Sequence, residues 1–568
     1  MKRRHFLRQM AHLAPVAAIA ATPDTSSASQ ASSRASFQIQ EPRVFFYDDG
    51  RHAAGLYQFE PPLTVSDHVF TVDQLVNSGV DTYVYCAAIE GGTVVYNSQV
   101  AQKWGENVTR WTHYVWYRAY LILQQLIADG HDPLKLLCDR CHEAGILMLA
   151  SGSVCLQGGD RATHGGLGRK SDFVYNNPQF QVGDENDLRN KQTPPSRLNF
   201  LRPEVRRERM TVFTELLTRY ETDGIELNLA ETVPYCPFNE VDRLAPVMTQ
   251  WIRDLGAVAR KAEDAQSRRK RIYARIPAHP ESWKKIGYAI PVWISEKLVD
   301  GFICVGSEEE RMDQDLDLAS VVQLTRGTDC RVLASFSNTL YRQLEKYATP
   351  PMIWAAAANA YAQGADGFGL GDAHWTPNGW PWTHHEYQTL RLLGSPEMLA
   401  TANKLYHLRS ERIDSHPQSW LPGSTRALPC ALSEGESKEV SLRVADDLAR
   451  WGNLGRVKSV QLRTRFTNYQ PYVDRVRIEL NGRELPESCL AMIDLTYRLL
   501  KVGAVSPYGY IFQYSLPPEY YPQPGYNLVK VTLLRRDPKL NLPFEVYDVD
   551  CSVEYRLHRH FEEHPITY

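Results

Sequence analysis

The sequence predicts an α/β fold: a (β/α)8 TIM barrel followed by an antiparallel β-sandwich domain. Between Arg43 and about His374, short apolar segments alternate with helical segments, the pattern of parallel strands joined by crossover helices. Eight such segments can be counted, and eight strand–helix units close a barrel. After Trp420 the pattern changes to alternating strands separated by turn signals, which is typical of a sandwich.

The eight strand candidates are short and rich in apolar residues. In chain order they are Val44–Tyr47, Thr82–Ala88, Ile146–Ala150, Gly224–Leu229, Ile272–Ile276, Gly301–Val305, Val332–Phe336 and Gly367–Leu370. Apolar residues recur at helical spacing in the connecting segments Val205–Tyr220, Leu244–Ala262 and Met352–Gln363. A doubly wound open sheet is the alternative, but no glycine-rich phosphate loop follows the first strand.

Three parts of the chain are expected from composition. Residues 1–37 are predicted to be a signal and linker, 38–410 the barrel, and 420–560 the sandwich. Strand-like alternation in the last part is clearest at Glu439–Val444, Val457–Phe466, Arg475–Leu480 and Asn527–Leu534. The sandwich is either a sugar-binding module or a brace for the barrel, and we favour the brace.

The first residues have the layout of a twin-arginine export signal. Arg3 and Arg4 precede a short apolar run, Met10–Ala21, in which Ala18 and Ala20 form an A-x-A cleavage site. The run is shorter than the roughly 20 residues that span a bilayer, and no longer apolar run follows it. We therefore expect an exported protein without a transmembrane segment, located in the periplasm or outside the cell.

Charge and cysteine spacing exclude several classes of partner. The net charge of -3 gives no electrostatic footprint for nucleic acid. Cys138 and Cys141 have no second pair at zinc-finger spacing, so we expect buried helical thiols and no metal site. No cofactor is predicted, and the sequence leaves the oligomeric state open.

Acidic and aromatic residues gather where the predicted strands end, which in this fold is the reactive face. They are Asp48 after the first strand, Glu90 after the second, Glu231 after the fourth, His279 after the fifth, Glu308 after the sixth, and Asp372, His374 and Trp375 after the eighth. Trp375, together with Trp380 and Trp382, offers flat indole faces for sugar rings. This face is therefore the predicted binding site for a carbohydrate.

Alternation along the fourth strand places Glu226 and Asn228 on the inner side of the barrel. A carboxylate there is costly unless it is paired, hydrogen-bonded or functional. The alternative to a catalytic role is an ion pair with Arg275 of the neighbouring strand that serves structure alone.

Glycoside hydrolysis needs two carboxyl groups that flank the scissile bond. Glu226 is the first catalytic candidate, with Asp372 as its preferred partner and Glu308 next. The predicted substrate-binding residues are Asp48, Glu90, Asn228, Glu231, Arg275, His279, His374 and Trp375. Glu231 is also a candidate acid if its loop folds inward.

Several segments resemble the glycosyl-hydrolase-like family 10 barrel proteins of bacteria. They are Leu201–Arg209 (LRPEVRRER), Arg219–Asn228 (RYETDGIELN), Tyr273–Pro277 (YARIP) and Gln363–Phe368 (QGADGF). The resemblance implies a TIM barrel with a polysaccharide-related role, and a sandwich like the one often attached to such barrels. Relatives usually carry aspartate where this chain has Asn228, so the resemblance implies either that hydrolysis has been lost or that the acid role has shifted to Glu226 or Glu231.

Two further hypotheses remain open at this stage. The first is a non-catalytic carbohydrate-binding barrel that has lost its chemistry, which the amide at Asn228 favours. The second is a polysaccharide lyase, in which His279 or a tyrosine would act as the base. The sugar, its linkage and the stereochemistry of cleavage are not determined by the sequence.

Overall fold

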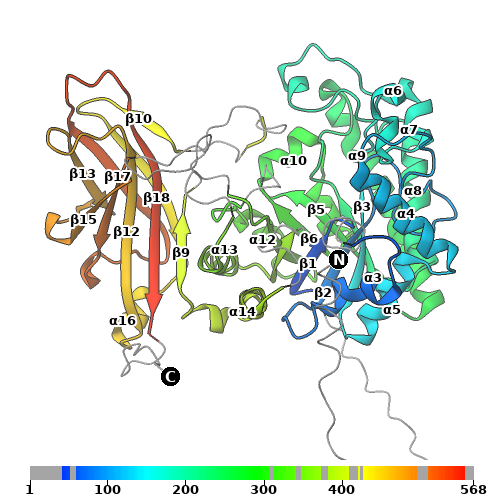
Figure 1. Cartoon of the computed structure of the whole chain (residues 1–568), viewed down its shortest axis with the longest axis horizontal. Coiled ribbons are helices and arrows are strands. Elements are labelled where there is room, and N and C mark those ends of the chain that lie inside the picture. The colour runs from blue at the N-terminus through cyan, green and yellow to red at the C-terminus, as the bar shows by residue number, and fades with distance from the viewer. Residues whose placement is uncertain are drawn as a thin grey trace, which may run out of the picture. The chain divides into compact units, whose positions relative to one another are not determined.

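Eight parallel strands close into a barrel in the N-terminal part of the chain (Figure 1). The structure is a computed structural model that describes residues 41–50, 59–306, 312–340, 347–371, 382–408, 420–422, 427–495 and 509–556. The barrel strands are β1 (Val44–Asp48), β2 (Thr82–Ala88), β3 (Leu147–Ser153), β4 (Gly224–Asn228), β5 (Arg271–Pro277), β6 (Gly301–Val305), β7 (Arg331–Phe336) and β8 (Gly367–Gly371). Because β8 pairs with β1, the sheet is closed, and the predicted barrel is confirmed.

An aspartate precedes each even-numbered strand and is bonded to the strand before it. The carboxylates of Asp81, Asp223, Asp300 and Asp366 accept hydrogen bonds of 2.8–3.1 Å from backbone N–H groups near the starts of β1, β3, β5 and β7. Each carboxylate therefore ties two neighbouring strands together at the N-terminal end of the barrel. Three of these aspartates are followed by glycine, in Asp223-Gly224, Asp300-Gly301 and Asp366-Gly367, and this Asp-Gly repeat reflects the contact as well as a tight turn into the strand.

Large rings fill the barrel where the neighbouring strand carries glycine in register with the ring. A side chain at Gly369 would place its Cβ 2.2 Å from the Phe45 ring, and one at Gly301 would meet the Tyr273 ring at 2.5 Å. The glycines are therefore required by close approach of aromatic rings. The buried residues of this inner core are Phe45, Val84, Leu149, Tyr273, Ile303 and Leu333.

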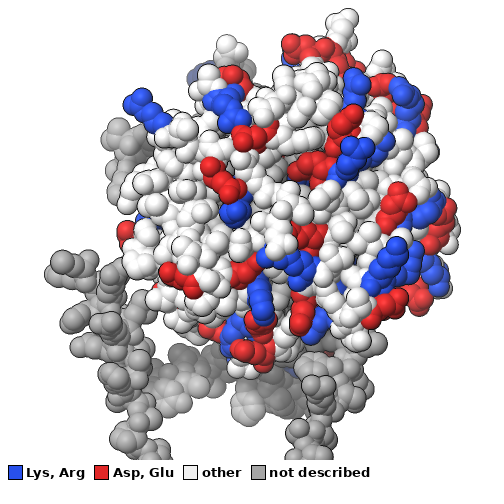
Figure 2. Space-filling model, turned by 90° about the vertical axis from the view of Figure 1, so that its right-hand side faces the viewer, with Lys and Arg blue, Asp and Glu red and all other residues white. Residues whose placement is uncertain are grey.

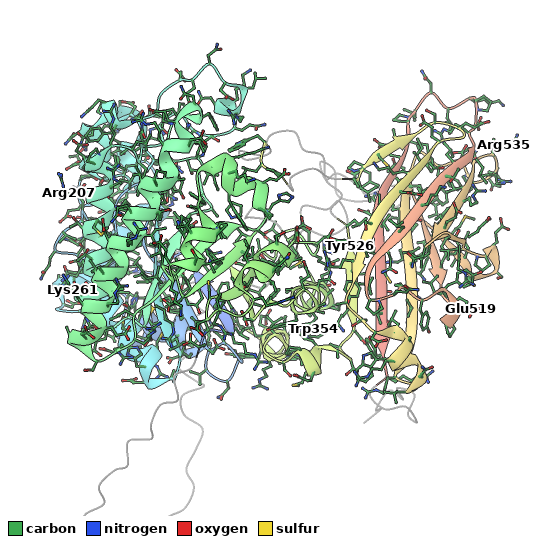
Figure 3. The ribbon with its side chains drawn as sticks, turned by 180° about the vertical axis from the view of Figure 1, so that it is seen from behind. Arg207, Lys261, Trp354, Glu519, Tyr526 and Arg535 are labelled. Carbon is green, nitrogen blue, oxygen red and sulfur yellow. The ribbon has the colours of Figure 1, made fainter. Side chains whose placement is uncertain are left out.

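Amphipathic helices surround the barrel. They include α3 (Val65–Asp73), α4 (Tyr114–Ala128), α5 (Pro133–Glu143), α8 (Pro203–Thr218), α9 (Val241–Gln266), α10 (Pro280–Ile286), α11 (Ile290–Ser295), α12 (Ala319–Thr325), α13 (Pro350–Ala362) and α14 (His384–Leu393). Exposed side chains such as Arg207 of α8 and Lys261 of α9 point away from the barrel (Figure 3). Cys138 and Cys141 of α5 are buried, as predicted for helical thiols.

Charges of both signs are mixed over the surface. Figure 2 shows Lys and Arg side chains interspersed with Asp and Glu on one face, without a region of a single sign. This distribution provides no extended field that would attract a polyanion to that face. In the described ranges, none of the helices combines the length and hydropathy that crossing a bilayer requires.

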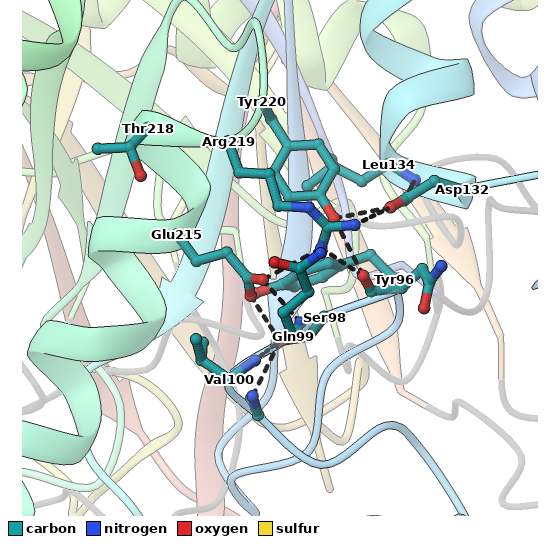
Figure 4. Close-up of polar contacts among 12 residues, drawn as sticks. Tyr96, Ser98, Gln99, Val100, Asp132, Leu134, Glu215, Thr218, Arg219 and Tyr220 are labelled. Atoms are coloured by element: carbon teal, nitrogen blue, oxygen red, sulfur yellow. Dashed lines mark hydrogen bonds and ion pairs between the residues drawn. The ribbon is translucent and has the colours of Figure 1, made fainter.

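The loops that follow β2 and β3 are long and are fixed to the helices. Glu215 of α8 accepts hydrogen bonds from the Tyr96 hydroxyl at 3.0 Å and the Gln99 N–H at 2.7 Å, both from the loop after β2 (Figure 4). The loop after β3 carries the short helices α6 (Arg161–His164) and α7 (Asp172–Asn176). Between β3 and α8 it covers residues 154–202.

Two antiparallel sheets follow the barrel. One has the order β10-β18-β12-β16-β15 with β9 added to β18, and the other has the order β11-β17-β13-β14. Their strands are β9 (Lys404–His407), β10 (Cys430–Leu432), β11 (Ser437–Val444), β12 (Val457–Thr467), β13 (Arg475–Leu480), β14 (Arg483–Glu484), β15 (Leu490–Asp494), β16 (Tyr510–Ser515), β17 (Gly525–Arg535) and β18 (Phe544–Tyr555). The predicted sandwich is confirmed, although β9 comes from the range assigned to the barrel.

Helix α13 of the barrel also contributes to the core of the sandwich. Ala355 packs in the second hydrophobic cluster, which is built mainly from sandwich residues. On α13, Trp354 donates to the Thr389 carbonyl of α14 at 3.1 Å (labelled in Figure 3). Arg443 of β11 donates to Asp315 of the segment before α12 at 2.8 Å. The packing of Ala355 and the Arg443–Asp315 bond join the barrel to the sandwich, and the bracing role itself stays a prediction.

The interior of the barrel predicts a marked cost for Gly369→Ala. The added methyl group would collide with the Phe45 ring, so we expect a loss of about 1–3 kcal/mol in the free energy of unfolding. Gly256→Ala in α9 is the control, because the nearest atom to its Cβ is 3.5 Å away and alanine favours a helix. Chaotrope unfolding measures both variants, and equal stabilities would contradict the packing described.

Buried His68 predicts a loss of stability in mild acid. Burial lowers the pKa of His68 to about 4, while its Nε2 lies 3.0 Å from the Pro133 carbonyl oxygen. The unfolded chain therefore takes up this proton first, and stability falls as the pH drops from about 6.5 toward 4, by roughly 3 kcal/mol in all. His68→Gln should flatten that part of the stability curve, and an unchanged curve would show that His68 does not titrate there.

Candidate active site

A buried ion pair lies inside the barrel. Glu226 of β4 points inward as predicted; its Oε1 accepts a hydrogen bond from Nε of Arg275 on β5, and the two side chains are 0% and 2% exposed. The pair that the sequence allowed as a structural alternative is therefore present. Glu226 Oε2 has no hydrogen-bond partner within the described residues. Such a buried oxygen is costly, and groups of this kind are enriched at functional sites.

Arg275 connects Glu226 to the mouth of the barrel. It pairs in register with Asn228, two residues nearer the carboxyl ends of the strands than Glu226. Its Nη1 donates to the Ser335 hydroxyl of β7 at 3.0 Å. Its guanidinium carbon lies 4.6 Å from the centre of the Tyr47 ring, within the range of a cation–π contact. Arg275 thus links three strands across the interior.

Tyr47 lies between the charges of this site. Its side chain comes from β1 and is partly exposed. Burial raises the pKa of Tyr47 well above its usual value, and the nearby Cys86, Glu226 and Glu231 raise it further, while Arg275 lowers it. Two glutamates therefore act on one phenol, which stays protonated and able to donate a hydrogen bond. Tyr47 is not among the site residues predicted from the sequence, although alternation along the first strand places it inward.

Glu231 is the carboxylate that reaches the mouth with solvent access. It follows β4, is partly exposed, and accepts a hydrogen bond of 2.9 Å from the hydroxyl of Ser153 at the end of β3. Ser153 occupies an inward position of its strand, opposite Asn228. The loop that carries Glu231 therefore folds inward, which was the condition set for its role as an acid.

Asn228 and Glu90 are held by local hydrogen bonds. The amide oxygen of Asn228 accepts the Ala230 N–H at 3.1 Å, and the side chain is buried. This bond fixes the turn that leads to Glu231. Glu90 Oε1 accepts from Arg169 Nη2 at 2.5 Å, so the rim carboxylate after β2 is ion-paired with the loop after β3.

Asp48 faces away from the interior, in contrast to the substrate-binding role proposed for it from sequence. Its carboxylate accepts hydrogen bonds from Thr71 of α3 at 3.2 Å and from the Tyr83 hydroxyl at 2.5 Å. Because Phe45 is an inner residue, alternation along β1 turns Asp48 toward the helices. The same alternation assigns the inward position to the next residue, Asp49.

Some of the remaining predicted site residues lie within the described part of the chain, and the others lie outside it. His279 caps α10, since its Nδ1 accepts the Glu281 N–H at 3.3 Å. Trp382 packs on Phe46 with ring centres 5.4 Å apart, on the helix side of β1. Outside the described residues lie Glu308, Asp372, His374, Trp375 and Trp380, together with the export signal.

The arrangement combines an ionised pair below the mouth with a solvated acid at its edge. Arg275 is the ion-pair partner of Glu226, and Glu231 accepts a hydrogen bond from the Ser153 hydroxyl. A carboxyl group with solvent access can take up and release a proton during a reaction cycle. Within the described residues, no three His, Cys, Asp or Glu side chains gather as metal ligands would.

Comparisons with known proteins were made for the whole chain. No protein-family model and no curated protein matches the sequence, so the resemblance to glycosyl-hydrolase-like family 10 stays a prediction. The PgaB (BpsB) glycoside hydrolase domain from Bordetella bronchiseptica is 15% identical over 62% of this chain and 99% of its own, with a TM-score of 0.39.

Two other solved structures are similar at the same level. α-L-Fucosidase isoenzyme 2 from Paenibacillus thiaminolyticus is 14% identical over 64% of this chain and 50% of its own, with a TM-score of 0.40. A glycoside hydrolase family 18 N-acetylglucosaminidase from Paenibacillus barengoltzii is 12% identical over 62% of this chain and 99% of its own, with a TM-score of 0.33. The sequence identities and TM-scores are low, so the fold assignment rests on the strand pairings of the barrel itself.

The buried pair predicts strong coupling between positions 226 and 275. Arg275→Met would leave the Glu226 charge buried without its partner, so we expect a loss of about 3–5 kcal/mol in the free energy of unfolding. The double variant Glu226→Met, Arg275→Met removes both charges and should recover most of that loss. Urea unfolding of the single and double variants measures the coupling, and additive losses would contradict the pair.

Proposed function

We propose that this protein is an exported glycoside hydrolase that acts on a poly- or oligosaccharide, with Glu231 as its general acid and base. The observation that carries the proposal is the position of Glu231, bonded to Ser153 over the mouth of the barrel and partly exposed. In a TIM barrel this end of the strands is where reactions take place. A glutamate at that edge has the proton-transfer chemistry that a glycosidic oxygen requires.

Glu226 acts in this proposal as a positioning residue below the mouth. It has no exposed surface, so a sugar ring that enters the mouth meets Tyr47 before it meets Glu226. The negative charge of Glu226 fixes Arg275, and Arg275 in turn holds the ring of Tyr47. A fixed ion pair and a phenol that can donate a hydrogen bond form a preorganised polar floor beneath the bound sugar.

We propose that the second carboxyl group of the reaction belongs to Asp372 or Glu308, as predicted from the sequence, or to Asp49. Asp49 directly follows β1, on the side of the strand that alternation turns inward, and it is buried. The remaining predicted contacts with substrate come from Asn228, Arg275, His374 and Trp375.

A non-catalytic carbohydrate-binding barrel is the second candidate function. Asn228 favours it, because an amide bonded to the Ala230 N–H stands where relatives of the resembled family carry an acid. That protein would bind sugar at the same mouth and release no product.

Replacement of Glu231 by Gln tests the proposed reaction. With an acid–base role, Glu231→Gln should lower turnover by roughly 10²–10⁴-fold, since the amide keeps the Ser153 contact but cannot transfer the proton. Purified protein is incubated with a panel of glycans and the reducing ends that appear are counted. Products that absorb in the near ultraviolet would instead identify a lyase.

Glu296→Gln is the matched control, because this glutamate pairs with Arg253 on the outer helices at 2.6 Å and should leave turnover unchanged. Wild-type activity in Glu231→Gln would remove Glu231 from the mechanism. Sugar binding without reducing ends from any glycan would establish the non-catalytic alternative.

A further inference from the structure

Helix α4 and the residues before it expose an unusual concentration of aromatic and apolar side chains. Large hydrophobic residues at least 36% exposed are rare in the described part of the barrel region, residues 41–408. There are nine such residues in that part of the chain. Five of them lie on α4 or in the loop that leads to it: Val100 (50%), Tyr114 (70%), Val115 (42%), Tyr117 (36%) and Leu121 (36%). An apolar patch of this kind on a surface marks an interaction site.

The rings of this patch form one arrangement, which we call the α4 aromatic surface: Trp111, Tyr114, Tyr117 and Tyr120. Trp111 lies 5.5 Å from Tyr117 and 5.3 Å from Tyr120, and the rings of Tyr117 and Tyr120 are nearly parallel at 21°. These four residues follow one another at intervals of three along the chain. On a helix this spacing makes each residue a surface neighbour of the next, while the row turns gradually around the helix axis.

Two glycines shape the seat of Trp111. A Cβ at Gly105 would lie 2.5 Å from the Trp111 ring, and a Cβ at Gly168 would lie 2.7 Å from it. Both glycines have positive φ angles, 74° and 76°, which other residues rarely adopt. The indole therefore rests on bare backbone and is fixed in place, so the surface is rigid before any partner arrives.

A row of stacked side chains connects this surface to the mouth of the barrel. Glu90 at the end of β2 binds Arg169, and the Arg169 guanidinium lies 5.7 Å from the centre of the Trp116 ring. Trp116 stacks on exposed His113 at 4.7 Å with an interplanar angle of 22°. His113 directly precedes Tyr114, so flat side chains extend from the rim to the α4 aromatic surface.

We propose that the α4 aromatic surface is a second binding site for a polymeric glycan whose chain continues into the barrel mouth. This inference rests on the proposed function and specifies its substrate as a polysaccharide. Planar rings with hydroxyls at their edges stack on the apolar faces of sugars and bond their polar groups. A second copy of the protein would instead favour a contact with a more apolar centre than these tyrosines and the exposed His113 provide.

The test compares Tyr114→Ala, Tyr117→Ala with the wild-type chain. Both rings are exposed, so the fold should tolerate their loss. Migration is measured in native gels that contain carboxymethyl cellulose, xylan, glycol chitin, dextran or polygalacturonate. The wild-type protein should be retarded by at least one of these polymers. The affinity of the double variant for that polymer should be lower by at least roughly tenfold. Tyr472→Ala, which removes a tyrosine that is 85% exposed on the sandwich, should bind like the wild type.

Three outcomes would overturn the proposal. The first is that no polymer retards the wild type, and the second is that the double variant is retarded equally. The third is a wild-type dimer in sedimentation velocity that the double variant loses, which would identify a second copy as the occupant. The reducing-end assay on the wild-type protein separates this inference from the proposed function. If reducing ends never appear while the double variant still loses polymer binding, the hydrolase fails and the binding surface stands.

Discussion

The ion pair between Glu226 and Arg275 is the constraint on which the polar interior of this barrel depends. Arg275 cannot leave the interior, because its guanidinium is bonded to Glu226, donates to Ser335 and lies on the Tyr47 ring. Removal of either charge would leave the other buried without compensation. The pair therefore determines what lies at the floor of the mouth.

The lower interior is built on a different principle, the fit of rings against glycines. Phe45 and Tyr273 occupy the space left by Gly369 and Gly301, and the carboxylates before the even-numbered strands tie the strands together at the opposite end from the mouth. Stability is thus provided at one end of the barrel. The other end is left to polar groups that are partly solvated, as expected of a scaffold that positions reactive side chains.

Much of this fold follows from sequence periodicity, and less of the site does. The strands Thr82–Ala88 and Gly301–Val305 are observed as predicted, because apolar runs between helical segments define parallel strands. Alternation also placed Glu226 inside. Its depth was not predictable, since the height of a side chain in the barrel depends on the stagger between neighbouring strands. Asp48 shows the reverse case. Alternation along the first strand would have predicted an outward side chain, but the residue was selected because it lies close to the strand end.

The aromatic residues show a similar limit. Trp104 and Trp283, which lie near rim loops in the sequence, are buried, and Trp382 packs against the helix side of β1. In the described part of the barrel region, the most exposed large rings, Tyr114 and Tyr117, lie on α4, and the segment Trp111–Tyr120 has five aromatic residues in ten. That density was a usable signal, but the side of the helix that faces solvent is decided by how the loop after β2 packs on α8.

A crystal structure of Glu231→Gln with an oligosaccharide retained by the wild-type protein tests the central claim most directly. We expect a sugar ring above Tyr47, with its glycosidic oxygen within hydrogen-bond distance of the amide at position 231. A sugar bound elsewhere, with the mouth of the barrel empty, would contradict the assignment of this mouth as the catalytic site.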